Sequence, residues 1–445
     1  MPNAAHEHEL LELISSIRSS AANLANFCEK HQLPLPTSSA PALAAVDSSS
    51  LDSVPYFEAK AAIVNAAQQL VRLTRGPREH LLALSFEHCA TASLQVILKY
   101  KLANHVPLEG TTTYAAIAQA VGRPEVHPAL VSRIIDHSTS YDIFDVRPGG
   151  LVAHSPASAL LVTDPDLEAW MDLSATIAYP AGASIPKALE EYGYSMEAEE
   201  AAYGVSIGRK ISQFKRFRET DGGTQLHEMF ARAMRGIAAG GAYDIRHAVN
   251  GGYPWYQLEQ SGHLVVDVGG GPGHVAIALA KKYPRLRFEV QDLPETVTVS
   301  ERSCPDELKS RIKYRSHDFM TPQPPHDVAD NESIAYFCRF ILHDWSDKYA
   351  RVILQGLASA LQPQDRIIVN EVVVPDPGTE TRERERRMRD RDMLMLMNLN
   401  GRERTKAAFE DLCSSVTPKL QVHRIHRPDQ GELSLIDITL YGSTS

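Results

Sequence analysis

The segment LVVDVGGGPGHVAIALAKKY, at positions 264–283, constrains the fold of this chain more than any other. Residues 264–268 have the apolar character of a buried strand, DVGGGPG follows at 267–273, and HVAIALAKKY has the apolar spacing of a helix. A glycine turn between a strand and a helix lets the backbone approach a ligand at the carboxyl edge of a parallel sheet. The segment therefore predicts an α/β domain that binds a ligand at this turn.

From about residue 262 onwards, predicted strands and helices alternate, which is typical of a parallel α/β sheet. The predicted strands are 264–268, 286–290, 312–316, 333–339 and 366–374. The predicted helices between them are about 274–283, 294–303 and 347–361. Two late strands, 419–425 and 433–440, are predicted to pair antiparallel at one edge of the sheet.

The spacing of the glycines distinguishes between two kinds of ligand. The dinucleotide fingerprint GxGxxG is incomplete, because the sixth place counted from Gly269 holds His274. The pattern present is DxGxGxG, with Asp267 two residues before Gly269 and with Gly271 and Gly273 at alternate positions. An acid at this place suits a positively charged ligand better than a diphosphate. S-adenosylmethionine carries an ammonium and a sulfonium group and no phosphate, and it is the cofactor that we expect.

Two further strand ends carry groups that suit the same cofactor. Asp292 ends the second predicted strand in FEVQDLP, where a carboxylate can accept both ribose hydroxyls. Asp318 and Phe319 follow the third strand in SHDF, where the acid can accept from the adenine amino group and the ring can stack on its face. Each acid alone would be a surface or capping residue. As a set at the ends of three strands, they favour S-adenosylmethionine over a dinucleotide.

His343 lies just beyond the fourth strand, in FCRFILHDWSD, on the same predicted edge of the sheet. The fifth strand ends near Glu371, and Glu403 lies in NGRERT after a long helical stretch. A carboxylate within reach of an imidazole fixes its tautomer and stabilises the imidazolium. The three residues therefore predict a general base that deprotonates a phenol, whose oxygen then attacks a methyl group in line. The sequence holds no HExxH motif and no Cys/His cluster, so no metal is predicted.

The chain is predicted to have four parts. They are a helical arm and linker at 1–55, a winged-helix-like dimerisation domain at 56–165, a helical connector and substrate-pocket roof at 166–255, and the catalytic domain at 256–445. The arm has an apolar stripe that needs to be buried, either against a partner subunit or against its own body. The sequence leaves both alternatives open.

The winged-helix-like part raises the question of DNA binding. TTTYAAIAQAVGRPEVHPALVSRIIDHSTS predicts a helix, a turn at Gly122 and a second helix, and YDIFDVRPGGLVAHS predicts two short strands. This plan most often binds DNA. Residues 111–163 contain three Arg or Lys and four Asp or Glu, however, so the module lacks the positive charge that phosphate contacts require. A structural or dimerising role is predicted instead, with no nucleic-acid partner.

The charge and the cysteine content of the chain limit its possible partners and its cellular location. The 445 residues include 45 Lys and Arg against 55 Asp and Glu, a formal charge of −10 that argues against a nucleic-acid or anionic-membrane partner. No apolar run reaches the roughly 18 residues that a membrane helix needs. The start, MPNAAHEHELLEL, is unlike a secretory signal, and five scattered cysteines without a CxxC indicate a reducing, cytoplasmic location.

One arginine-rich run, ETRERERRMRDRD at 380–392, has six Arg and five acidic residues. Opposite charges recur four residues apart, which stabilises an exposed helix. The run is therefore predicted to be a solvated helix with no part in binding.

In this order, VVDVGGGPG, EVQDLP, SHDF, RFILHDWSD and NGRERT resemble the plant caffeate-type and fungal polyketide-type S-adenosylmethionine-dependent O-methyltransferases. The resemblance covers about 110–440. It implies a Rossmann-like class I methyltransferase sheet, an N-terminal and mostly helical winged-helix domain that forms a homodimer, and a small aromatic substrate.

The resemblance also implies a role for individual residues. For the cofactor, Gly269, Gly270 and Gly271 would contact the methionine end beside Asp267, Asp292 the ribose, Asp318 and Phe319 the adenine, and Arg339 and Trp345 would lie close by. His343 would be the general base, with Glu371 and Glu403 as its flanking carboxylates. The residues that would approach the acceptor are Phe230, Met234, Asp344, Met393 and Asn398.

Two functions follow from these predictions. The first is O-methylation of a phenolic or enolic hydroxyl in an aromatic or polyketide secondary metabolite. The alternative is a pericyclase or dehydratase of natural-product biosynthesis that binds S-adenosylmethionine without transferring its methyl group, with Arg339 beside His343 as a hydrogen-bond donor. The presence of His343 together with two acids favours methylation.

Overall fold

The computed structural model describes residues 4–36, 53–219, 223–329, 332–428 and 431–443. The chain forms two compact units, each built from two stretches of sequence. The N-terminal unit comprises Met1–Pro180 and Arg216–Ala239, and the C-terminal unit comprises Ala181–Lys215 and Gly240–Ser445. The segment 166–255 thus contributes to both units, and the four domain boundaries given above stay predictions.

The N-terminal unit is mostly helical. Its helices are α1 (Ala4–Lys30), α2 (Val54–Leu84), α3 (Glu87–Lys99), α4 (Tyr114–Val121), α5 (Pro128–Thr139), α6 (Pro156–Thr163), α7 (Pro165–Leu173) and α12 (Gly223–Ala238). Its strands are β1 (Thr112–Thr113), β2 (Phe144–Arg147) and β3 (Leu151–His154). Among the described residues, no single helix is long and apolar enough to cross a membrane, and only the bent pair of α2 and α3 meets that test, by length and composition.

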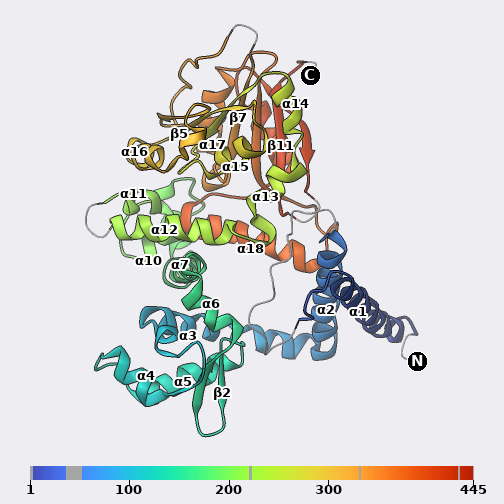
Figure 1. Cartoon of the computed structure of the whole chain (residues 1–445), viewed down its shortest axis with the longest axis vertical. Coiled ribbons are helices and arrows are strands. Elements are labelled where there is room, and N and C mark those ends of the chain that lie inside the picture. Colours follow the sequence, from blue (N-terminus) through green and yellow to red (C-terminus); the bar gives the residue numbers. More distant parts are fainter. Residues whose placement is uncertain (1–3, 37–52, 220–222, 330–331, 429–430, 444–445) are drawn as a thin grey trace. The chain divides into compact units, whose positions relative to one another are not determined.

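The C-terminal part of the apolar stripe of α1 packs on α2. Leu24 and Cys28 of α1 are buried together with Tyr56 and Ala59 of α2, and the rings of Phe27 and Tyr56 lie 5.5 Å apart. Figure 1 shows the two helices side by side. The C-terminal part of the arm therefore docks on the same chain, whereas Ile14 of the stripe is 45% exposed, and burial against a partner subunit stays a prediction.

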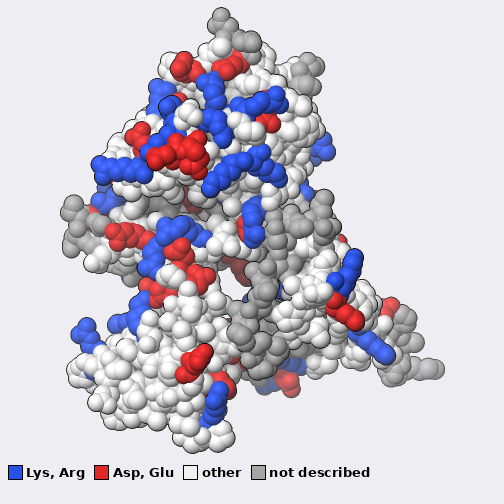
Figure 2. All heavy atoms as spheres, in the orientation of Figure 1, with Lys and Arg blue, Asp and Glu red and all other residues white. Residues whose placement is uncertain are grey.

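The predicted helix, turn, helix and hairpin are all present. Thr113 caps α4 by accepting a hydrogen bond from the backbone N–H of Ala116 at 3.1 Å, and α4 ends at Gly122, whose φ of 65° is left-handed. Strands β2 and β3 pair antiparallel, and β1, which was not predicted, pairs with β3. On the face drawn in Figure 2, the surface over α4, α5 and β2 carries few charged side chains of either sign.

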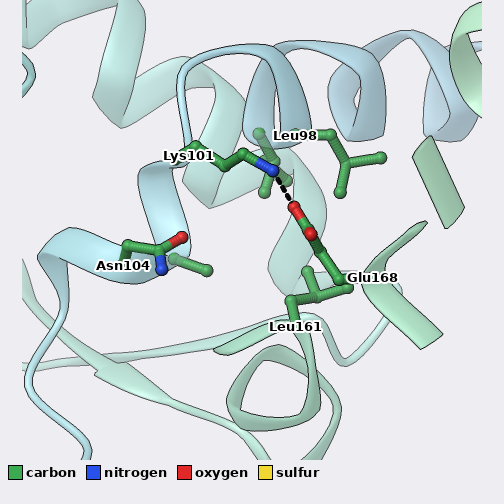
Figure 3. A pocket seen from close by; sticks show the side chains of 7 residues that line it. Leu98, Lys101, Asn104, Leu161 and Glu168 are labelled. Carbon is green, nitrogen blue, oxygen red and sulfur yellow. Dashed lines mark hydrogen bonds and ion pairs between the residues drawn. The ribbon is translucent and has the colours of Figure 1, made fainter. Parts of the chain in front are cut away.

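A small cavity lies inside the N-terminal unit beside an ion pair between Lys101 and Glu168 (Figure 3). Leu98 and Leu161 form part of its wall. Its volume of about 10 Å³ is close to the space that one water molecule occupies. The cavity is therefore too small for a metabolite.

The C-terminal unit is built on one twisted sheet. Its strands are β4 (Leu264–Val268), β5 (Arg287–Asp292), β6 (Ile312–Ser316), β7 (Ile334–Arg339), β8 (Arg366–Val374), β9 (Arg404–Thr405), β10 (Leu420–His426) and β11 (Leu433–Leu440). Its longer helices are α9 (Ile185–Tyr192), α15 (His274–Lys282), α16 (Pro294–Ser303), α17 (Asp347–Ala358), α18 (Arg382–Leu399) and α19 (Lys406–Ser414), and α14 (Trp255–Gln260) is shorter.

The strand order is β10-β11-β8-β7-β4-β5-β6, and β9 pairs with β8. Strands β4 to β8 are parallel, and β11 and β10 add antiparallel at one end, as predicted. Chain order reverses at β4, because β5 lies on one side of it and β7 on the other. In sheets of this kind the ligand binds at the carboxyl edge beside such a reversal, which is where the glycine turn lies.

Alternating side chains of the sheet supply two hydrophobic layers. Val266 of β4 belongs to a buried cluster that includes Ile353 of α17 and Phe409 of α19. Its neighbour Val265 belongs to a second cluster, which includes Trp255 of α14 and Leu279 of α15. Because successive side chains of a strand point to opposite faces, α17 and α19 cover one face and α14 and α15 cover the other. The two layers hold the strand ends, and thus the site, in place.

Candidate active site

The glycine turn after β4 packs closely against neighbouring side chains. A Cβ atom on Gly269 would lie 2.5 Å from Cδ1 of Ile341, and one on Gly270 would lie 2.6 Å from Cγ of Asp267. Gly271 has a φ of 55°, and its backbone N–H donates to Oδ2 of Asp292 at 2.8 Å. Glycine is therefore required in this turn for close packing at two positions and for backbone conformation at a third.

Asp267 is a buried carboxyl group beside this turn. It is only 2% exposed, and its Oδ2 has no hydrogen-bond partner among the described residues. Burial, together with the charge of Asp292, raises the pKa of Asp267 to about 7, against an opposing effect of Arg339. An unsatisfied buried carboxyl group is costly unless a cation compensates it. This buried acid beside the glycine turn fits a cofactor with a positively charged end.

Asp292 ends β5 next to the turn. Its Oδ1 accepts from the backbone N–H of Leu293 at 2.7 Å, while Oδ2 holds Gly271. A carboxylate offers about four acceptor positions, so ribose hydroxyls can still bind. Burial raises the pKa of Asp292, and these backbone hydrogen bonds oppose the rise.

The residues predicted to hold the adenine lie on the same edge of the sheet. Asp318 is exposed after β6, and its Oδ1 accepts from the backbone N–H of Met320 at 2.9 Å. The ring of Phe319 lies 6.2 Å from that of Trp345, in an edge-to-face arrangement. The structure thus brings Phe319 and Trp345 together, and their contact with adenine stays a prediction.

His343 and Glu403 form a buried hydrogen-bonded pair. Nδ1 of His343 lies 2.7 Å from Oε1 of Glu403, and both side chains are at most 3% exposed. Burial alone would lower the pKa of His343, but the charges of Glu403, Asp344 and Glu371 raise it overall. The pKa of Glu403 is lowered although burial opposes this, because His343 and Arg391 stabilise the carboxylate. Hydrogen bonding at Nδ1 directs Nε2 away from Glu403.

Glu371 holds the backbone rather than the imidazole ring. Its Oε1 accepts from the backbone N–H groups of Ile341 and His343, both at 3.1 Å. Burial raises its pKa, although the charge of His343 opposes this. The two acids predicted to flank His343 therefore have different roles. Glu403 orients the imidazole ring, and Glu371 fixes the backbone of the turn that contains His343.

Asp344 lies on the other side of the ring. Its Oδ1 is 3.4 Å from Nε2 of His343. Burial raises the pKa of Asp344 to about 6, and the charge of His343 opposes this rise. A carboxylate here stabilises a proton held on Nε2.

Sequence reasoning missed Arg391, at the end of the arginine-rich run. The run does form a helix, α18, and exposed pairs four residues apart are present, such as Arg389 with Glu385 at 2.7 Å. Arg391 departs from the prediction, because its side chain is only 8% exposed and its Nε donates to Oε1 of Glu403 at 3.0 Å. An arginine in a run of alternating charges carries no sequence signal for burial, so only the fold reveals this contact.

Arg339 is buried in the same neighbourhood. Its terminal nitrogens donate to Oδ1 of Asn370 and to the backbone carbonyl of Tyr243, and burial lowers its pKa to about 10. Because both nitrogens are engaged with the protein, its predicted contact with the cofactor stays a prediction.

The residues predicted to approach the acceptor are divided between the two units. In the C-terminal unit, Met393 is exposed on α18, and Asn398 is buried with an Oδ1 that has no partner among the described residues. Phe230 and Met234 belong to α12 of the N-terminal unit, where the ring of Phe230 lies 5.5 Å from that of Phe217. Their approach to the acceptor stays a prediction. In the described ranges, no group of three or more His, Cys, Asp or Glu side chains is placed to bind a metal ion.

The strand order, the glycine turn and the acids at the strand ends define a class I methyltransferase. The family model of the O-methyltransferase domain matches residues 254–417. O-methyltransferase CTB2 of Cercospora beticola is 63% identical, over 99% of this chain and 95% of that protein. O-methyltransferase elcB of Phaeosphaeria nodorum is 54% identical, over 96% of this chain and 94% of that protein.

The chain belongs to the O-methyltransferase family, among the fungal polyketide-type members. It is an O-methyltransferase that uses S-adenosylmethionine and acts on a small molecule, as predicted. The solved structure of OxaC has a TM-score of 0.73, at 19% identity, over 98% of this chain and 100% of that chain. At that identity the similarity concerns the fold alone.

Proposed function

We propose that the protein methylates a phenolic or enolic hydroxyl of an aromatic polyketide, with His343 as the general base. The observation that carries the proposal is the 2.7 Å hydrogen bond between Nδ1 of His343 and Oε1 of Glu403. With the proton held on Nδ1, Nε2 has the lone pair needed to accept a proton from the acceptor.

The proton transfer uses groups already in place. Nε2 takes the hydroxyl proton, and the imidazolium that forms is stabilised by Glu403 at Nδ1 and by Asp344, whose Oδ1 is 3.4 Å from Nε2. Glu371 fixes the backbone of His343, so that the ring does not have to reorganise during the reaction. The oxygen of the acceptor is left as an anion in a largely desolvated site.

The cofactor is proposed to bind along the carboxyl edge of the sheet. Gly269, Gly270 and Gly271 would hold its methionine end, with Asp267 near its positive charge, and Asp292 would hold the ribose. When bound, S-adenosylmethionine supplies an electrophilic methyl group on a sulfonium. The proposed mechanism uses no metal ion, because His343 rather than a metal generates the nucleophilic oxygen of the acceptor.

The direct test is incubation with methyl-labelled S-adenosylmethionine and a panel of phenolic polyketides. The proposal expects label in an O-methyl product that gains the mass of one methylene. A rearranged or dehydrated product without label would instead identify the pericyclase or dehydratase that the same fold could support.

We further propose that the protein is a homodimer formed by its N-terminal unit. In support, several large apolar side chains of this unit are exposed, such as Leu81 at 64% and Phe86 at 64%. Light scattering should give about twice the 49.1 kDa of one chain. Leu81→Glu should lower that mass and Leu189→Glu, an exposed leucine of the C-terminal unit, should not. A monomeric wild-type protein would contradict the proposal.

A cytoplasmic location is proposed on the basis of the cysteines, all five of which are free thiols. Cell fractionation with a tagged chain tests this, and recovery from a membrane or secreted fraction would contradict it.

A further inference from the structure

Glu403 receives two hydrogen bonds on a single oxygen. Nδ1 of His343 and Nε of Arg391 both lie within hydrogen-bonding distance of Oε1, at 2.7 Å and 3.0 Å. The other oxygen, Oε2, is buried and has no partner among the described residues. The neighbouring Asp392 accepts from the backbone N–H of Glu403 at 2.9 Å. Two successive residues of α18 therefore hold the side chain and the backbone of Glu403.

The guanidinium group of Arg391 lies against two aromatic rings. Its Cζ lies 4.7 Å from the ring centroid of Tyr243 and 4.6 Å from that of Phe340. Phe340 in turn stacks on the ring of His343, with centroids 5.3 Å apart and planes 17° apart. The φ of Phe340 is 56°, a left-handed value that is costly for an aromatic residue and that places its ring in this stack. Arg391 is thus held as part of the same cluster as the imidazole.

The number of protons on the His343–Glu403 pair decides whether His343 can act as a base. With one proton, the pair consists of neutral His343 protonated on Nδ1 and ionised Glu403, and Nε2 has a free lone pair. With two protons, the pair is either an imidazolium beside a carboxylate or a neutral imidazole beside a carboxylic acid. In both two-proton forms Nε2 bears a hydrogen, so His343 cannot act as a base. Burial of a carboxylate favours uptake of the second proton, because the ionised group is desolvated.

Arg391 is the arginine that opposes this uptake through direct contact. Arg404 uses its three nitrogens on Asp347 and on the backbone carbonyls of Leu342 and Trp345. Arg339 uses its terminal nitrogens on Asn370 and a backbone carbonyl. Within the described part of the chain, the other charged and titratable groups that act on the pair are Tyr243, Asp344, Glu371, Arg391 and Asp392. Arg404 acts on Glu371, and Arg339 lies beside Arg391.

We propose that Arg391 is a positioning residue that anchors Glu403 and weakens the binding of a second proton by the His343–Glu403 pair. A larger share of the resting enzyme then has a lone pair on Nε2 of His343 than it would have without this cation. The inference rests on the proposed function in that it takes His343 as the base. It adds that the availability of this base depends on a fixed cation that contacts Glu403.

The test is a pH titration of His343 by ¹⁵N NMR, in full-length protein with labelled histidine and without cofactor or acceptor. The His343 signals are assigned by their loss in His343→Gln. In Arg391→Gln and Arg391→Met, the pH at which Nε2 loses its proton should rise by about one unit or more. Arg391→Lys keeps the charge and should titrate close to the wild type. Arg389→Met, an exposed arginine of the same helix, is the control and should not change the titration.

A titration of Arg391→Gln that matches the wild type would overturn the inference, as would a shift in Arg391→Lys as large as that in Arg391→Gln. The glutamine variant can still donate a hydrogen bond to Glu403, so it keeps the test available if the methionine variant does not fold. The titration needs no acceptor, so its result is separate from the label-transfer assay. Failure of label transfer with a shifted titration would contradict the proposed function alone.

Discussion

Nδ1 of His343 lies 2.7 Å from Oε1 of Glu403, although 60 residues separate them in the chain. The pair is assembled by two neighbouring elements, since His343 follows β7 and Glu403 immediately precedes β9, which pairs with β8. A further acid, Glu371 of β8, binds the backbone N–H of the same histidine. The central strands thus fix both the ring and the backbone of the base.

The raised pKa of Asp267 predicts a pH-dependent cost to folding. Its pKa is about 7 in the folded protein, against a usual value of 3.8, so the folded state binds the extra proton between these values. The contribution of this proton to the stability of the folded protein is therefore complete below about pH 4, and it is lost as the pH rises through about 7. Asp267→Asn should raise the thermal midpoint at pH 8, by an amount that shrinks as the pH falls. Thermal unfolding without cofactor measures this, with the exposed Asp327→Asn as the control.

If the thermal unfolding midpoint of Asp267→Asn changed with pH in the same way as that of the wild type does, the carboxyl group of Asp267 would not contribute to the pH dependence of stability.

Asp292→Asn should weaken cofactor binding. The substitution removes the negative charge beside Gly271 and one acceptor for the ribose hydroxyls. Hydrogen bonds to charged groups contribute about 1.5–3 kcal/mol, so affinity should fall by roughly 10- to 150-fold. Calorimetric titration with S-adenosylmethionine measures this. Glu295→Gln, an exposed acid nearby, should bind as the wild type does, and wild-type affinity in Asp292→Asn would remove the ribose assignment.

Gly270→Ala should destabilise the C-terminal unit and block the cofactor turn. The new Cβ would lie 2.6 Å from Cγ of Asp267 and 2.9 Å from Cγ1 of Val290, so the turn has to shift. Overpacking of this kind costs about 1–3 kcal/mol. Thermal unfolding and cofactor titration measure the two effects. Gly240→Ala, which has nothing within 4 Å of its Cβ, is the control, and equal behaviour of the two variants would contradict the close packing.

Replacements of Glu371 should separate its structural contact from its charge. Glu371→Ala leaves the backbone N–H groups of Ile341 and His343 without their acceptor, which should cost at least about 2 kcal/mol of stability. Glu371→Gln keeps an oxygen at this place and should retain most of the stability. Chemical denaturation compares the two variants. A glutamine variant as unstable as the alanine variant would show that the charge of Glu371 is needed for folding.

Much of the C-terminal unit was predictable because its signals are local. The predicted strands 264–268, 312–316, 366–374 and 433–440 coincide with β4, β6, β8 and β11, and the other predicted strands differ from the observed ones by at most two residues at an end. Strands β4, β7, β8 and β11 are mostly apolar and largely buried runs. The helix predicted at 347–361 ends earlier, at Ala358, ahead of Pro363.

Two features of the site were not predictable from local patterns. The division of labour between Glu371 and Glu403 depends on which face of a strand end meets the turn at His343, and this is a tertiary property. Arg391 was assigned to a solvated helix because its neighbours alternate in charge, yet its side chain is buried and donates a hydrogen bond to Glu403. These side chains come together through the pairing of strands that are far apart in the sequence. The spacing of charges along one helix carries no information about that pairing.

The central claim, that His343 is the base for O-methylation, is tested most directly by single-turnover methyl transfer in His343→Gln. With the acceptor found in the label assay, the rate should fall by about 100- to 10,000-fold while cofactor affinity stays that of the wild type. The wild-type rate should also rise with pH through the raised pKa of His343. Methyl transfer by His343→Gln at the wild-type rate would contradict the account.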